Sequence, residues 1–188
     1  DFDLPKAMRE GLVKTLLLDK RQELTALEDL DYNAVRDEKG KVVGLSDGQR
    51  MMLCAGLTKL LRLEKDFIKL DKNKNPKMLV VCQDTAVSPY VRDFLLTEGL
   101  TEDDIVTIDS NQKGDMGEEE WKKVKAKLFD IDHYAKPKVI ISVLMLREGF
   151  DVNNICVLVP LRSSKAPILL EQLIGRGLRL MWREEEYR

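Results

Sequence analysis

Short, mostly apolar runs recur along the second part of the chain, and they constrain its fold more than any other feature. They occupy residues 78–82, 105–108, 139–143 and 155–159. A continuous apolar run is typical of a strand that is covered on both faces, whereas a half-exposed strand alternates apolar and polar residues. Segments with helical spacing separate the runs, and alternation of strands and helices predicts a parallel sheet with right-handed crossovers. We therefore predict an α/β fold, a parallel sheet flanked by helices.

Two helices between these strands and one after the last strand are indicated by apolar residues at helical spacing. The positions are Val87, Val91, Phe94 and Leu95 in the first, Trp121, Val124 and Leu128 in the second, and Leu169, Leu170, Leu173 and Ile174 in the last. Ligands of parallel sheets bind at the carboxyl ends of the strands, where the loops lie. We therefore look for functional residues in the loops that follow the four apolar runs.

The first part of the chain is charged and helical, with a predicted hairpin in its middle. Gly40 lies between two short β-prone runs, which indicates a turn. Ser46 and Gln49 have the spacing of a capping box at the start of a helix. We divide the chain into a connecting region, residues 1–75, and the α/β domain, residues 76–188. The apolar positions of the predicted long helix are Leu53, Leu57, Leu60, Leu61 and Ile68.

Composition excludes several classes of protein. The chain has 31 Lys and Arg against 33 Asp and Glu, a net charge of −2, so nucleic acid would be bound along a local groove rather than by a global basic field. Cys54, Cys82 and Cys156 are scattered among apolar residues, which predicts reduced thiols in an intracellular, cytoplasmic protein without a metal cluster. No apolar run approaches the roughly 18 residues of a membrane span. The start at Asp1, without Met or a basic leader, predicts a piece of a longer chain.

Residues 171–179, Glu-Gln-Leu-Ile-Gly-Arg-Gly-Leu-Arg, form the most specific segment of the sequence. Arg176 and Arg179 are three residues apart, so on a helical turn they point the same way. Two guanidinium groups directed at one place favour a polyanion, such as a triphosphate. Gly175 and Gly177 lack side chains that would obstruct a ligand or a facing domain. Without further information, a helix C-terminus with a glycine stop explains the segment about equally well.

A second segment, residues 146–151, follows a predicted buried strand and reads Leu-Arg-Glu-Gly-Phe-Asp. A carboxylate in this position, that of Asp151, can accept hydrogen bonds from a ribose. Gly149 lets the backbone approach a nucleotide closely. The alternative for Asp151 is an Asx turn or a cap.

A third segment, residues 80–85, joins an apolar strand to a polar loop. Thr85 can cap the helix that follows or contact a phosphate, and we favour the cap. Ser110, after the next strand, can donate a hydrogen bond to a DNA phosphate or lie in a turn. Both hydroxyl groups are candidates for contacts with nucleic acid.

All three segments resemble motifs of superfamily 2 helicases. Residues 80–85 resemble the motif at the first strand of the lobe, and residues 109–112, which include Ser110, resemble the loop that follows this motif. Gln172-x-x-Gly175-Arg176-x-x-Arg179 resembles the QxxGRxxR motif that closes their catalytic core, and the segment ending at Asp151 resembles the REGxD form of another helicase motif. The resemblance implies a RecA-like fold, the second lobe of a P-loop NTPase. It implies that Arg179 is the arginine finger, that Arg176 contacts the γ-phosphate, and that Gln172 bonds near the attacking water. Asp151 lies about twenty residues before Gln172, with one predicted strand between them, which favours the ribose contact.

The helicase resemblance also bears on nucleic-acid contacts. Many members of the superfamily have Thr where Val143 stands here, and the threonine hydroxyl contacts the nucleic-acid backbone. Ser142 is the candidate to replace it.

Within superfamily 2, residues 157–162 and 171–180 look most like the restriction subunit of type III restriction-modification enzymes. The resemblance covers residues 77–182 and is loose over residues 1–70. It implies part of an ATP-dependent DNA translocase or helicase. Its implied partners are double-stranded DNA, the N-terminal RecA-like lobe of the same polypeptide and a DNA methyltransferase or specificity subunit. A repair or remodelling translocase of the same superfamily and a non-catalytic α/β interaction module are the alternatives.

The sequence contains no GxxxxGK[ST] phosphate loop, and its one Asp-Glu pair, Asp37-Glu38, lies in the predicted hairpin turn, where it is a poor substitute for a pair that holds Mg²⁺. In P-loop enzymes the phosphate loop cradles the nucleotide, and a carboxylate after a strand helps to hold Mg²⁺. The resemblance therefore implies that ATP and Mg²⁺ are held mainly by the partner lobe and that this chain completes the site with arginines.

We predict that the 188-residue chain alone hydrolyses no ATP and binds it only weakly. The phosphate cradle and the Mg²⁺ ligands provide most of the affinity for a nucleotide, and both are expected in the partner lobe. Isothermal titration with ATP and Mg²⁺ measures the affinity. A dissociation constant in the low micromolar range would contradict the prediction.

Overall fold

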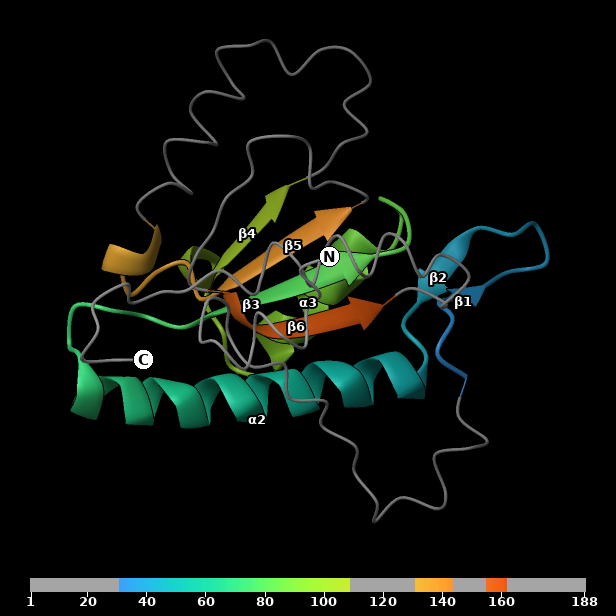
Figure 1. Ribbon diagram of the computed structural model, residues 1–188. Helices are drawn as coiled ribbons and strands as arrows, with labels where there is room; N and C mark the ends of the chain where they lie inside the picture. Colours follow the sequence, from blue (N-terminus) through green and yellow to red (C-terminus); the bar gives the residue numbers. More distant parts are fainter. Residues whose placement is uncertain (1–30, 109–130, 144–154, 162–188) are drawn as a thin grey trace, which may run out of the picture.

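The structure, a computed structural model, describes residues 31–108, 131–143 and 155–161 (Figure 1). Within these ranges the main sheet has four strands in the order β4-β5-β3-β6, and each neighbouring pair is parallel. The parallel sheet with helices packed on it confirms the predicted α/β fold. Its strands are β3 (Lys77–Cys82), β4 (Ile105–Ile108), β5 (Val139–Val143) and β6 (Ile155–Leu161). Two short 3₁₀ helices, η2 (Glu102–Asp104) and η3 (Ile131–His133), precede β4 and β5.

The four strands lie where the apolar runs predict them. Every residue of β3 and of β5 is buried, as expected for strands covered on both faces. Strand β6 extends beyond the predicted residues, through Pro160 to Leu161, and its residues are alternately buried and half-buried. It is an edge strand of the described sheet, and an edge tolerates a proline because one side of the strand makes no ladder hydrogen bonds.

Helix α2 (Asp47–Leu70) lies along one face of the sheet (Figure 1). It begins with the predicted capping box: the Gln49 N–H donates to the Ser46 hydroxyl oxygen, and the Ser46 N–H donates to Gln49 Oε1, both at 3.3 Å. These bonds satisfy two N–H groups at the start of the helix. At the other end the Asp71 N–H donates to the carbonyl of Phe67. The helix thus ends inside the polar segment where the sequence predicts its end.

Two of the five apolar positions of α2 do not face the core. Leu61 and Ile68 are 53% and 62% exposed. They are seven residues apart, so they lie on the same side of the helix. That side is not the one that packs on the sheet. Phe67, 8% exposed, fills the core near the end of the helix in place of Ile68. The predicted positions that are buried are Leu53, Leu57 and Leu60.

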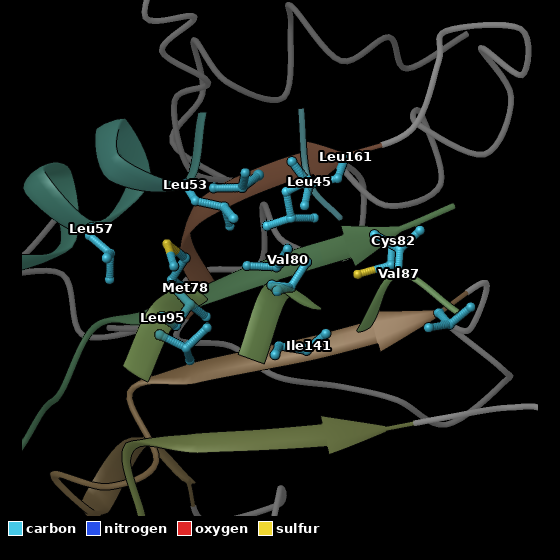
Figure 2. Close-up of a cluster of buried hydrophobic side chains, with 14 of the residues drawn as sticks. Leu45, Leu53, Leu57, Met78, Val80, Cys82, Val87, Leu95, Ile141 and Leu161 are labelled. Carbon is cyan, nitrogen blue, oxygen red and sulfur yellow. The ribbon is translucent and has the colours of Figure 1, made fainter. Parts of the chain in front are cut away.

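Helix α3 (Ser88–Thr97) lies on the same face of the sheet as α2. Its Val91 and Leu95 are fully buried in one cluster with residues of α2, β3, β5 and β6. Figure 2 shows side chains of this cluster converging from the helices and the sheet. A second cluster covers the opposite face and consists of Leu79, Val81, Ile108, Ile131, Ile140 and Ile155. The sheet is therefore apolar on both faces.

Helix α2 comes very close to the sheet at Gly56. A Cβ atom at this position would lie 2.6 Å from Cγ2 of Val159 in β6 and 2.8 Å from Sδ of Met78 in β3. Real Cβ atoms are not found at such distances, so only glycine permits the approach. The contact seats α2 on β3 and β6.

Strands β1 (Val35–Arg36) and β2 (Val42–Gly44) form the predicted antiparallel hairpin. Gly40 in its turn has a φ of 77°, a conformation that glycine adopts without steric cost. The hairpin lies beside the carboxyl ends of β3 and β6 (Figure 1). The Tyr90 hydroxyl of α3 donates to the Val42 carbonyl at 3.2 Å. The buried residues in and next to the hairpin are Ala34, Val42 and Leu45, all part of the main cluster.

The described part of the connecting region thus shares its core with the sheet. The division of the chain into residues 1–75 and 76–188 stays a prediction. No helix in the described part of the chain has the length and apolar character needed to cross a membrane.

We predict that Gly56→Ala lowers the free energy of unfolding by about 1–3 kcal/mol through overpacking. Alanine favours a helix by about 1 kcal/mol over glycine, but the Val159 side chain is too short to move aside. Urea denaturation of the chain measures the change. Gly44→Ala is the control, because its Cβ would meet no heavy atom within 4 Å. A Gly56→Ala variant as stable as the wild type would contradict the close approach of α2.

Candidate functional site

The carboxyl ends of the described strands lie along one edge of the sheet (Figure 1). Cys82, the last residue of β3, pairs in register with Val143 at the end of β5 and with Leu161 at the end of β6. This register brings the starts of the three following loops next to one another, at the edge where parallel sheets bind ligands. Of these loops the structure describes residues 83–87.

Most of the predicted site residues lie outside the described residues. In the sequence, each of them follows the carboxyl end of a described strand: Ser110 follows β4, Gly149 and Asp151 follow β5, and Gln172, Arg176 and Arg179 follow β6. Their grouping at one edge of the sheet stays a prediction.

Thr85 lies half-buried in the loop between β3 and α3. The side chain of Asp84 closes a turn around it: Asp84 Oδ1 accepts a hydrogen bond from the Ala86 N–H at 2.9 Å. The Val87 N–H donates to the carbonyl of Asp84 at 3.3 Å. The Ser88 hydroxyl donates to the carbonyl of Thr85 at 3.1 Å. The backbone on both sides of Thr85 is thereby fixed in an Asx-type turn.

The cap interpretation of Thr85 is wrong. Helix α3 begins at Ser88, its N-cap is Val87, and no side chain makes the cap hydrogen bond. Pro89 in the first turn has no N–H, so one of the groups that a cap would satisfy is missing. The phosphate contact of Thr85 stays a prediction.

Ser142 is buried in β5 and is 2% exposed. Its register partners are Val81 in β3 and Ile108 in β4. Val143, which occupies the usual threonine position of the predicted motif, is 1% exposed and belongs to the main cluster. A contact between Ser142 and nucleic acid stays a prediction, and it would require the hydroxyl to become accessible.

An ion pair that the sequence analysis missed joins the hairpin to the loop of Thr85. Arg36 Nη2 lies 2.5 Å from Asp84 Oδ2, and Arg36 Nη1 donates to the Gly40 carbonyl at 2.9 Å. The partners are 48 residues apart in the sequence, so no local sequence pattern predicts the pair. The side chains are 39% and 35% exposed. Exposed pairs of this kind contribute at most about 1 kcal/mol to stability. The main effect of this pair is therefore to fix the position of the Thr85 loop relative to the hairpin.

A cavity of about 330 Å³ lies at the opposite end of the sheet. Its lining includes Cys54 and Thr58 of α2, Glu98 after α3, and Asp104 and Lys138, which directly precede β4 and β5. The cavity is therefore at the amino ends of these strands and is not the predicted site. Within the described ranges, no group of three or more His, Cys, Asp or Glu residues is arranged to hold a metal ion.

Two of the residues that line this cavity, Cys54 and Asp104, have shifted pKa values. Burial raises the pKa of the Cys54 thiol, and the charge and hydrogen bond of Glu98 raise it further. Burial acts to raise the pKa of Asp104 as well, but hydrogen bonds from the Thr101 hydroxyl and N–H and the charge of Lys136 bring it below its ordinary value. The thiol therefore stays protonated and the carboxylate stays charged.

We predict that Cys54 reacts slowly with N-ethylmaleimide at about pH 8, because burial and Glu98 keep its thiol protonated. Glu98→Gln should increase the rate, which mass spectrometry measures for each cysteine separately. Glu102→Gln is the control, since it removes an exposed carboxylate that pairs with Arg92 instead. Equal rates for Glu98→Gln and the wild type would show that Glu98 does not act on the thiol.

Comparison with known protein families identifies the family of the chain. The helicase conserved C-terminal domain matches residues 56–181, from within α2 to beyond the last predicted site residue. A search of curated proteins gives no match. The match covers more than half of the chain, and the parallel sheet flanked by helices agrees with a RecA-like α/β fold. The chain therefore belongs to the helicase conserved C-terminal domain family and forms the C-terminal lobe of a helicase or translocase.

Proposed function

We propose that this chain is the second motor lobe of an ATP-dependent DNA translocase from a type III restriction enzyme. The observation that carries the proposal is the family match over residues 56–181, which includes both motif segments, residues 146–151 and 171–179. The register of β3, β5 and β6 supports it, because the chain segments that lead to these motifs leave the sheet side by side.

The nucleotide site is proposed at the carboxyl edge of the sheet. Helicase domains generally use ATP and Mg²⁺, and bound ATP supplies the phosphoanhydride bond whose hydrolysis drives the motor. Arg179 stabilises the charge that develops on the γ-phosphate, Arg176 binds the same group, and Gln172 orients the attacking water. Asp151 accepts hydrogen bonds from the ribose. Gly149 has no side chain, so the backbone can approach the nucleotide closely. The N-terminal lobe of the same polypeptide holds most of the nucleotide and the Mg²⁺.

The same edge is proposed to contact double-stranded DNA. Thr85 and Ser110 follow β3 and β4 and would donate hydroxyl hydrogen bonds to phosphates. Contacts to phosphates fix a protein on DNA without reading its sequence, as a translocase requires. Ser142 completes the proposed set and is its least accessible member.

The type III assignment rests on the likeness of residues 157–162 and 171–180 to the restriction subunit. It makes a DNA methyltransferase or specificity subunit the proposed protein partner. Cys54, Cys82 and Cys156 form no disulfide, which fits a reducing compartment, and we place the protein in the cytoplasm. A non-catalytic interaction module is disfavoured because the motif segments keep their arginines, glutamine and aspartate.

We predict that Arg179→Ala, in the full-length enzyme, lowers DNA-stimulated ATP hydrolysis by about 10³–10⁵-fold. An arginine finger binds the transition state more strongly than bound ATP, so the affinity for ATP should fall only modestly. Arg179→Lys should restore little activity, because an ammonium group lacks the planar fork of a guanidinium. A steady-state ATPase assay with and without DNA measures the rates.

Arg62→Ala is the matched control for this experiment, because Arg62 is an exposed arginine of α2 outside the predicted site. If Arg179 only stabilises the end of its helix, Ala costs about 0.3–1 kcal/mol of stability, Lys restores it, and hydrolysis is unaffected. An ATPase rate within a few-fold of the wild type in Arg179→Ala would refute the proposed role.

A further inference from the structure

We propose that Arg36 of the β1–β2 hairpin is a positioning residue for the nucleic-acid contact at Thr85, and that it acts through the carboxylate of Asp84. The inference rests on the proposed function, to which the Thr85 contact belongs. It adds the hairpin, which precedes the family match, to the machinery of the motor lobe.

The carboxylate of Asp84 makes two different contacts. Its Oδ1 accepts from the Ala86 N–H at 2.9 Å, and its Oδ2 lies 2.5 Å from Arg36 Nη2. Because Thr85 stands between Asp84 and Ala86, the first contact closes a ring around its backbone. The second contact determines where the carboxylate lies, and so where this ring is held relative to the hairpin.

Arg36 is itself held on its other side. Its Nη1 donates to the Gly40 carbonyl at 2.9 Å, so the planar guanidinium is fixed by two bonds that diverge from one fork. The turn that presents this carbonyl is ordered by Asp37, whose Oδ1 accepts from the backbone N–H groups of Lys39 and Lys41 at 2.9 and 2.8 Å. The hairpin turn therefore forms a firm support for the guanidinium.

The hairpin does not need Arg36 in order to stay on the sheet. Val42 is 2% exposed and Ala34 is 7% exposed, both within the main cluster. The Tyr90 hydroxyl holds the Val42 carbonyl independently. Loss of the Arg36 side chain should therefore free the Asp84 carboxylate while the fold remains in place.

The test uses the full-length enzyme with Arg36→Ala, Asp84→Ala, the double variant and Thr85→Val. The DNA concentration that gives half-maximal ATPase stimulation is measured for each. Asp84→Ala and Thr85→Val should raise it about fivefold, as expected for the loss of one hydrogen bond, and Arg36→Ala should raise it about three- to fivefold. The maximal rate should not change in Arg36→Ala, because Arg36 lies outside the proposed nucleotide site. The half-maximal DNA concentration of the double variant should be no higher than that of Asp84→Ala, because Arg36 acts only through Asp84.

Three controls separate positioning from other roles. Arg62→Ala removes an exposed arginine of α2 and should leave the half-maximal DNA concentration unchanged. The salt dependence of DNA binding should have the same slope in Arg36→Ala as in the wild type, because no cation that neutralises a phosphate is lost. The melting temperature of the 188-residue chain with Arg36→Ala should lie within about 4 °C of the wild type, since the pair is exposed.

Several results would overturn the inference. Additive losses in the double variant would mean that Arg36 does not act through Asp84. A salt slope lower by about one in Arg36→Ala would mean that Arg36 binds a phosphate itself. If Thr85→Val raises the half-maximal DNA concentration and Arg36→Ala does not, the role of Arg36 is refuted and the proposed function still holds. A wild-type enzyme whose ATPase does not respond to DNA would remove both.

Discussion

The close contact of α2 with β3 and β6 is the constraint on which the rest of the arrangement depends. At Gly56 the helix backbone comes so near to Met78 and Val159 that no side chain fits between them. This contact fixes the helix along its axis, and the capped start of the helix directly follows β2 in the sequence. Seating α2 therefore brings the hairpin to the carboxyl edge of the sheet, where Arg36 reaches Asp84.

The fold could be predicted wherever local sequence determines structure. The runs that became β3 and β5 are apolar throughout, so burial on both faces leaves them little choice but a central strand. The capping box at Ser46 is equally local. The exposure of Leu61 could not be predicted, because helical spacing defines an apolar stripe but not how much of that stripe the sheet covers. Lys77 illustrates the same limit: it is fully buried at the start of β3, and its Nζ donates to the Tyr134 carbonyl at 2.6 Å, a partner 57 residues away.

The candidate site likewise has a part that local sequence reveals and a part that depends on contacts between distant residues. The resemblance to helicase motifs was enough to suggest a motor domain, because a motif such as the one around Arg176 and Arg179 lies in one continuous stretch of sequence. The surroundings of Thr85 were not predictable, since its loop is shaped by Asp84, by a helix that starts later than expected and by Arg36 from a distant strand. Side chains that act alone are visible in a sequence, whereas those that position others depend on the fold.

The charge of the chain also bears on how a motor of the proposed kind would hold DNA. Affinity for DNA comes largely from cations that release counterions, and a net charge of −2 provides little of it. Contacts through hydroxyl groups, such as the one proposed for Thr85, are weaker and depend on accurate placement rather than on charge. A translocase has to release DNA in every cycle, so a lobe that binds through positioned neutral groups gains control from small movements of a loop. With the proposed contact at Thr85, a fixed support such as the Arg36–Asp84 pair would affect DNA binding more than its small contribution to stability suggests.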